Sequence, residues 1–233
     1  MSISIVVPVY NEEDCLKECF LQITETFKNS DYELIFVNDG STDNSHQIIL
    51  ELIEKNQKIK YAFYEKNKGY SGAIREGFKM SENDFVSFLD ADLQYPPQDL
   101  FKMYGYAKEN NLDFVMGSPI KKIKYNSPLR KIMSFIYNAY ISLLFDIKVK
   151  DHNSLKLMRR KYLEKINFRY GYGMIEIETL LGFKMQGVPV ITYPINVQKR
   201  IAGKSKCSLK ITYRTVIDCL KLRFSKNKLI KNG

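Results

Sequence analysis

Short apolar runs alternate with longer segments of helical periodicity through the first half of the chain. The apolar runs predict strands at about 3–8, 33–38, 59–64, 85–90 and 113–117. Two apolar stripes of helical spacing lie between the first three of these strands. The first stripe is formed by Leu16, Cys19, Phe20, Ile23 and Phe27, and the second by Ile48, Ile49, Leu52 and Ile53. Asn11 is placed to cap the first helix. The alternation predicts an α/β fold with a mostly parallel sheet, helices on both faces, and ligands at the carboxyl ends of the strands.

The second half is less regular and predicts amphipathic helices towards the C-terminus. One apolar stripe is formed by Leu129, Ile132, Met133, Ile136, Tyr137, Tyr140 and Leu144. Another is formed by Leu209, Tyr213, Val216, Ile217, Leu220 and Phe224, with Lys210, Arg214, Lys221 and Arg223 beside it. A basic amphipathic helix suits a membrane surface, and a helix packed on the core carries the same stripe, so both interpretations of 209–224 stand.

Length and composition fit one good core, and the length alone allows one or two domains. The 233 residues are 45% apolar, and we expect a single domain over 1–225 followed by a frayed basic tail, 226–233. We divide that domain into a half over 1–120 and a half over 121–225. The four cysteines form no Cys-x-x-Cys pair, which predicts a reducing compartment. We expect no signal peptide, and the longest apolar run, 139–145, is far shorter than the roughly 20 residues that span a bilayer.

Charge is distributed unevenly along the chain. Residues 1–120 hold 11 basic and 20 acidic side chains, a net charge of −9, whereas residues 121–233 hold 25 basic and 6 acidic ones, a net charge of +19. The basic half would attract phosphate or an anionic membrane face, although a solvated lysine-rich surface has the same composition. Nucleic acid is not an expected partner, because the sequence contains no recognisable nucleic-acid-binding module.

The strand predicted at 85–90 runs into Asp90-Ala-Asp-Leu-Gln-Tyr-Pro-Pro97. Side chains alternate along an extended chain, so Asp90, Asp92 and Gln94 would share one side. Their hard oxygen atoms suit Mg²⁺ or Mn²⁺ together with the phosphates of a substrate. A polar turn after a core strand is the simpler interpretation of Asp-x-Asp alone, and the Leu-Gln-Tyr-Pro-Pro that follows makes the motif more specific.

Three further motifs lie at predicted strand ends. They are Ile3-Ser-Ile-Val-Val-Pro-Val-Tyr-Asn-Glu-Glu13, Glu33-Leu-Ile-Phe-Val-Asn-Asp-Gly-Ser-Thr-Asp43 and Asn67-Lys-Gly-Tyr-Ser-Gly-Ala73. A dinucleotide-binding enzyme is the rival interpretation, but the glycines of the third motif do not form Gly-x-Gly-x-x-Gly. With the 90–97 motif, the segments in this order resemble family 2 of the nucleotide-sugar glycosyltransferases. The 90–97 motif is most similar to the polyprenyl-phosphate hexosyltransferases, the group of dolichyl-phosphate mannose synthase.

The resemblance implies a nucleotide-diphospho-sugar transferase fold of the GT-A type and a set of site residues. It places Pro8, Tyr10, Glu12, Asp39, Gly69 and Ser205 at positions that bind the nucleotide-sugar. It places the metal ion on Asp92 and Gln94, with Asp90 near the sugar or the metal. The three metal-site residues would be catalytic together with Arg130, Arg200 and Glu176.

The resemblance is less complete on the acceptor side. The segment Arg200-Ile-Ala-Gly-Lys-Ser-Lys206 matches the Arg-x-x-Gly-x-Ser-Lys loop of the lipid-phosphate enzymes. Arg130 and Arg200 occupy two of the three arginine positions that gather around phosphate there, and Pro119 replaces the third. The segment 151–156 lacks the glycine of Asp-x-x-Ser-Gly-Phe-Lys/Arg. Glu176 matches a glutamate of the same enzymes, and a sugar hydroxyl as acceptor would need such a base.

These features predict inverting, metal-dependent transfer of a hexose from a UDP- or GDP-hexose to polyprenyl phosphate. The protein would be cytoplasmic and peripheral at the inner face of the cell membrane. A membrane-anchoring partner protein is a further possible partner. One alternative is transfer to a saccharide hydroxyl in surface-polysaccharide assembly. Another is a degenerate, non-catalytic binding subunit of a membrane complex.

Overall fold

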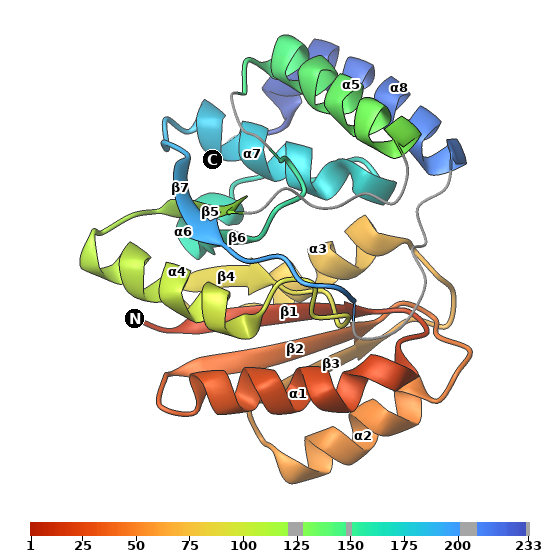
Figure 1. Ribbon diagram of the computed structural model, residues 1–233, viewed down its shortest axis with the longest axis vertical. Coiled ribbons are helices and arrows are strands. Elements are labelled where there is room, and N and C mark those ends of the chain that lie inside the picture. The colour runs from red at the N-terminus through yellow and green to blue at the C-terminus, as the bar shows by residue number, and fades with distance from the viewer. Residues whose placement is uncertain (121–127, 148–150, 201–208, 232–233) are drawn as a thin grey trace.

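The sheet at the centre of the fold has the strand order β3-β2-β1-β4-β6-β5-β7 (Figure 1). The computed structural model describes residues 1–120, 128–147, 151–200 and 209–231. Its strands are β1 Ile3–Val9, β2 Tyr32–Asn38, β3 Ile59–Phe63, β4 Phe85–Phe88, β5 Phe114–Pro119, β6 Lys156–Arg159 and β7 Ile191–Ile195. Strand β6 is antiparallel to both of its neighbours, and the other pairs are parallel. The predicted mostly parallel α/β sheet is therefore confirmed.

The helices form layers on both sides of this sheet. Their bounds are α1 Glu13–Phe27, α2 Ser45–Lys55, α3 Tyr70–Met80, α4 Pro97–Glu109, α5 Pro128–Phe145, α6 Arg160–Leu163, α7 Ile175–Met185 and α8 Leu209–Ser225. Two short 3₁₀ turns, η1 Tyr172–Met174 and η2 Lys226–Lys228, precede α7 and follow α8. One buried cluster joins α1, α2 and α4 to the sheet, and the other joins α3, α7 and parts of α5 and α8 to its opposite face. Figure 1 shows α5 and α8 side by side at the edge of the molecule, beyond α7.

The alternation of side chains along β1 explains why helices cover both faces. Ile3, Ile5 and Val7 are buried in the first cluster, whereas Val6 is buried in the second. Helix α3 lies close to this strand because Gly77 has no side chain: a Cβ atom there would be 2.2 Å from Val6 Cγ1. The close approach of α3 fixes the loop before it, which forms part of the candidate site.

Two outcomes differ from the sequence prediction at the level of the fold. Strands β6 and β7 were not predicted, because β6 is four residues long with a lysine at its start and β7 contains Pro194. The described part of the tail is not frayed, because Leu229 is buried and Ile230 pairs with Ile166. Within the described ranges, no helix is both long and apolar enough to span a bilayer.

Candidate active site

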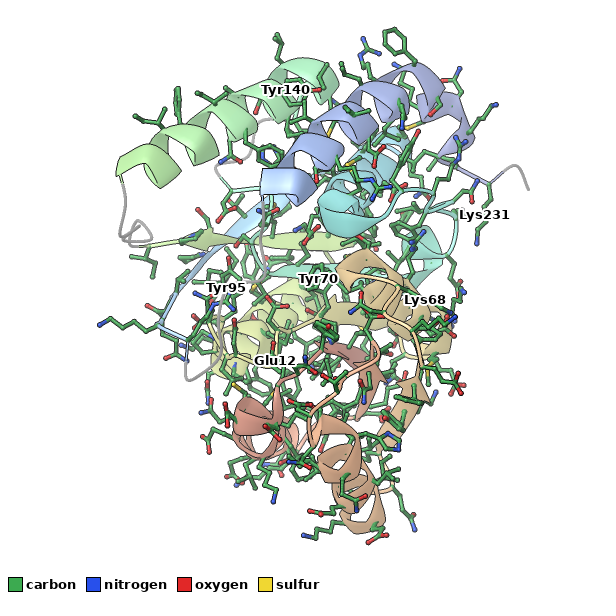
Figure 2. The ribbon with its side chains drawn as sticks, turned by 90° about the vertical axis from the view of Figure 1, so that its right-hand side faces the viewer. Glu12, Lys68, Tyr70, Tyr95, Tyr140 and Lys231 are labelled. Carbon is green, nitrogen blue, oxygen red and sulfur yellow. The ribbon has the colours of Figure 1, made fainter. Side chains whose placement is uncertain are left out.

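A cavity of about 420 Å³ lies at the carboxyl ends of β1, β2 and β4. Eight of the residues singled out from the sequence line it, namely Pro8, Tyr10, Glu12, Asp39, Gly69, Asp90, Asp92 and Arg200. Figure 2 looks onto these strand ends and shows Glu12 and Tyr70 near the middle of that face, with Tyr95 and Lys68 to either side. The structure thus gathers most of the predicted donor and metal positions around one space.

Not every predicted site residue belongs to this lining. Gln94 and Glu176 lie outside the set of residues that line the cavity. Ser205 falls outside the described residues, as does the side chain of Arg130, whose backbone belongs to α5. The roles assigned to these four residues stay predictions, as do the roles assigned to the eight residues that line the cavity.

The segment that carries the two aspartates is a turn rather than the end of a strand. Strand β4 ends at Phe88, the Leu93 N–H donates to the Asp90 carbonyl at 3.1 Å, and Leu93 has a φ of 55°. The alternation expected for an extended chain therefore does not hold beyond β4. The Gln94 N–H donates to Asp92 Oδ1 at 3.0 Å, so the turn itself orients the second carboxylate.

Both carboxylates have a defined partner in the cavity. Arg200 Nη1 lies 3.1 Å from Asp92 Oδ2, and the Tyr70 hydroxyl donates to Asp90 Oδ1 at 3.0 Å. Burial, with the neighbouring Asp92 charge as the next cause, raises the pKa of Asp90 to about 6. The site therefore concentrates negative charge where water cannot fully screen it.

The carboxylate oxygens at this site suit a divalent cation that takes its remaining ligands from a bound substrate. No group of three or more His, Cys, Asp or Glu side chains that could hold a metal occurs in the part of the chain that is described. Two carboxylates that face one cavity and repel each other are suited to Mg²⁺ or Mn²⁺, which take further ligands from phosphate oxygens and water. The side-chain amide of Gln94 is the third predicted ligand and is not placed on the cavity wall.

The opposite wall of the cavity is built around Asp39. Its Oδ1 accepts the Lys68 N–H at 2.7 Å, which ties the loop after β2 to the loop before α3. Burial raises the pKa of Asp39, and the backbone N–H groups of Lys68 and Gly69 act against that shift. Gly69 has a φ of 82°, a conformation that suits glycine at the start of α3.

Asn11 has a different role from the helix cap that was expected. The residue at the cap position of α1 is Glu12, and Asn11 adopts a φ of 52°. Asn11 Oδ1 accepts the Thr42 N–H at 2.7 Å. The side chain therefore joins the loops after β1 and β2, both of which hold residues that line the cavity.

Two charged side chains are buried on β6 and at the start of α7. Glu176, in the first turn of α7, is 5% exposed, and its Oε2 has no hydrogen-bond partner among the described residues. Burial raises the pKa of Glu176, and the charge of Lys156 opposes that rise. Lys156 itself is fully buried on β6.

Sequence reasoning missed Tyr70 and Lys156 as contributors to this region. Tyr70 is the first residue of α3 and follows Gly69 in a motif that was already assigned to a strand end, so its place could have been inferred. Lys156 stands at the basic end of the segment 151–156, which was compared with Asp-x-x-Ser-Gly-Phe-Lys/Arg, and it is a charge next to apolar neighbours, so both signals were available.

This fold, with a carboxylate-bearing turn after β4, is that of the GT-A type glycosyltransferases. The chain belongs to Glycosyl transferase family 2, whose profile it matches over residues 4–167. The family resemblance predicted from the four motifs is confirmed.

Individual relatives agree with this assignment. The uncharacterized glycosyltransferase YkcC of Bacillus subtilis is 29% identical over 223 residues, which cover 92% of this chain and 66% of that protein. The undecaprenyl-phosphate 4-deoxy-4-formamido-L-arabinose transferase of Proteus mirabilis is 33% identical over 165 residues, 69% of this chain and 49% of that protein. The chain spans about half to two thirds of the length of these curated relatives.

Solved structures share the fold. Glucosyl-3-phosphoglycerate synthase from Mycobacterium tuberculosis, in complex with Mn²⁺, uridine diphosphate and glucosyl-3-phosphoglycerate, superposes with a TM-score of 0.72 at 19% identity. The match covers 100% of this chain and 81% of the synthase. The same synthase has also been solved with Mg²⁺ and uridine diphosphate, with a TM-score of 0.72.

Proposed function

We propose that this protein transfers a hexose from a nucleotide-diphospho-sugar to polyprenyl phosphate at a membrane surface. The observation that carries the proposal is the cavity in which Asp90, Asp92 and Arg200 face Asp39 across the strand ends. This arrangement offers acceptors for a base or ribose on one wall and groups for a diphosphate on the other. The family membership and the lipid-phosphate relative from Proteus mirabilis support the choice of reaction.

On the donor side, Asp39 accepts hydrogen bonds from the base or the ribose, with Pro8, Tyr10 and Glu12 beside them. Asp92, Asp90 and Gln94 are the residues that would hold Mg²⁺ or Mn²⁺. Such an ion, when bound, neutralises the diphosphate as it departs. The Arg200 guanidinium moves from Asp92 to the oxygens of the diphosphate, to which it can donate two parallel hydrogen bonds. The acceptor oxygen attacks the anomeric carbon from the opposite face and inverts it.

On the acceptor side, a phosphate is already an anion and requires no strong base. Glu176 then orients the acceptor rather than deprotonating it. A saccharide hydroxyl would need to lose its proton during attack. Glu176, whose pKa is raised and whose Oε2 has no hydrogen-bond partner among the described residues, is then the candidate base. Transfer to a saccharide is therefore the second candidate function.

The outer helices suggest how a lipid-linked acceptor would be reached. Large apolar side chains are exposed on them, namely Ile132, Phe135, Ile136 and Leu143 on α5 and Leu220 and Phe224 on α8. Exposed cations on α8, Arg214, Lys221 and Arg223, flank this surface. Apolar side chains beside cations match the interface of an anionic membrane. We therefore place the α5–α8 surface, defined by these nine residues, at the inner face of the cell membrane.

The proposal is tested by following the sugar. Purified protein is incubated with radiolabelled UDP- and GDP-hexoses, Mg²⁺ or Mn²⁺, and polyprenyl phosphate in detergent. The expected result is a chloroform-soluble, mild-acid-labile product that forms with one of these donors. A product that forms only with a saccharide acceptor would favour the second candidate. A protein that binds nucleotide-sugar without turnover on either acceptor would indicate a non-catalytic binding subunit.

A further inference from the structure

Lys156 is the only lysine or arginine among the described residues that is fully buried. Its Nζ donates to the carbonyl oxygens of His152 at 2.7 Å and Ser154 at 2.9 Å. It forms no ion pair within the described part of the chain, so its charge is anchored by backbone rather than by a carboxylate. Burying an ammonium group without such a partner is costly, which makes its position informative.

The surroundings of Lys156 connect it to the site on two sides. Strand β6 pairs with β4, where the Ser87 hydroxyl donates to the Lys156 carbonyl at 2.7 Å, and β4 leads directly to Asp90. Strand β6 also pairs with β5, where Lys156 is in register with Met116, and β5 ends at Pro119. The residue thus lies on the strand between the aspartate turn and the position at which the family resemblance calls for a third arginine.

Three carboxylates act on this lysine. Burial lowers the pKa of Lys156, and the charges of Glu176, Asp151 and Asp90 oppose the shift in that order. These acids come from α7, from the segment before β6 and from the turn after β4. Together they would repel an anionic acceptor, and the positive charge of Lys156 near them offsets part of that repulsion.

We propose that Lys156 determines acceptor specificity by supplying a buried positive charge that lets a site with three nearby carboxylates receive a phosphate-bearing acceptor. This inference rests on the proposed function and names the residue that favours an anionic acceptor over a neutral one. The lysine acts through the field it creates and not through contact, because its side chain is fully buried. A positioning residue of this kind changes the rate of transfer to an anionic acceptor much more than the rate of transfer to water.

The test compares two acceptors in one protein. In Lys156→Met, transfer to polyprenyl phosphate should fall about tenfold or more, with most of the loss in KM for the lipid, because the missing charge no longer offsets the carboxylates. Slow hydrolysis of the nucleotide-sugar, in which neutral water is the acceptor, should stay within about twofold of the wild-type rate. Lys156→Gln keeps a hydrogen-bond donor near the two carbonyl oxygens. It should also lose transfer to polyprenyl phosphate while keeping hydrolysis, and it replaces the methionine variant if that variant does not fold.

Lys60→Met is the matched control. Lys60 is a partly buried lysine that pairs with Glu33 at 2.7 Å and Glu82 at 2.8 Å, near the opposite end of the sheet. The Lys60→Met variant should keep the wild-type rates of lipid transfer and of nucleotide-sugar hydrolysis per folded molecule. Equal losses of transfer and hydrolysis in both Lys156 variants, or no loss in either, would overturn the inference. Absence of lipid-linked product in the wild type would instead overturn the proposed function itself.

Discussion

Replacing Asp92 by asparagine is expected to abolish hexose transfer while leaving the fold intact. Asp92 is held by the Gln94 N–H and by Arg200, and it is a proposed ligand of the divalent ion. Loss of one carboxylate ligand should reduce turnover by about 10³-fold, on the order of 4 kcal/mol in activation free energy. Initial rates at saturating donor and metal measure the effect.

The control for this variant lies at the other end of the same strand. Asp84 precedes β4 and is half-exposed, so Asp84→Asn should retain full activity. Both variants should melt within a few degrees of the wild type, because neither removes apolar core packing. Substantial activity of Asp92→Asn, or undiminished wild-type activity in excess EDTA, would disprove the assignment of the metal site.

Replacing Phe135 and Leu143 together by serine is expected to release the protein from membranes. These side chains on α5 are 74% and 85% exposed, so the change removes apolar surface without opening the core. Burying one such side chain contributes roughly 1.5–3 kcal/mol when complete, so partial insertion of two should shift vesicle partitioning about tenfold or more. Cosedimentation with vesicles of graded anionic lipid content measures the shift.

The same assay separates the apolar and the electrostatic contributions. Wild-type binding should rise with the fraction of anionic lipid and fall with salt, because screening shortens to roughly 3 Å at 1 M. Phe63→Ser, which changes an exposed aromatic side chain on β3, is the control and should bind like the wild type. Equal binding of the double variant and the wild type would show that the α5–α8 surface does not face lipid.

Much of the half over 1–120 could be predicted because its signals are local. The five strands of the first half are mostly apolar, and the polar motifs directly follow β1, β2 and β4. In a parallel sheet such ends meet at one edge, so linear order is enough to bring Tyr10, Asp39 and Asp90 to one cavity.

The remainder depends on long-range packing that leaves no local pattern. The pairing of Arg200 with Asp92 joins segments far apart in the chain, and the sequence assigned that arginine to an acceptor phosphate instead. Strand β6 is short and antiparallel, so no periodicity reveals it. The turn at 90–94 also defeats an argument from strand alternation, although it brings Asp90 and Asp92 to the same cavity.

The most direct test of the account is calorimetric binding of UDP and GDP, in the presence of Mn²⁺, to the wild type and to Asp39→Ala. The account predicts that one of the nucleotides binds the wild type and binds the variant about 10- to 100-fold more weakly, because a hydrogen bond to a charged group is worth roughly 1.5–3 kcal/mol. Asp39→Asn can still accept the Lys68 N–H that orders the loop, and it should also bind more weakly because it lacks the charge. Equal affinity of all three proteins, or no binding of either nucleotide by the wild type, would contradict the claim that this cavity is the donor site.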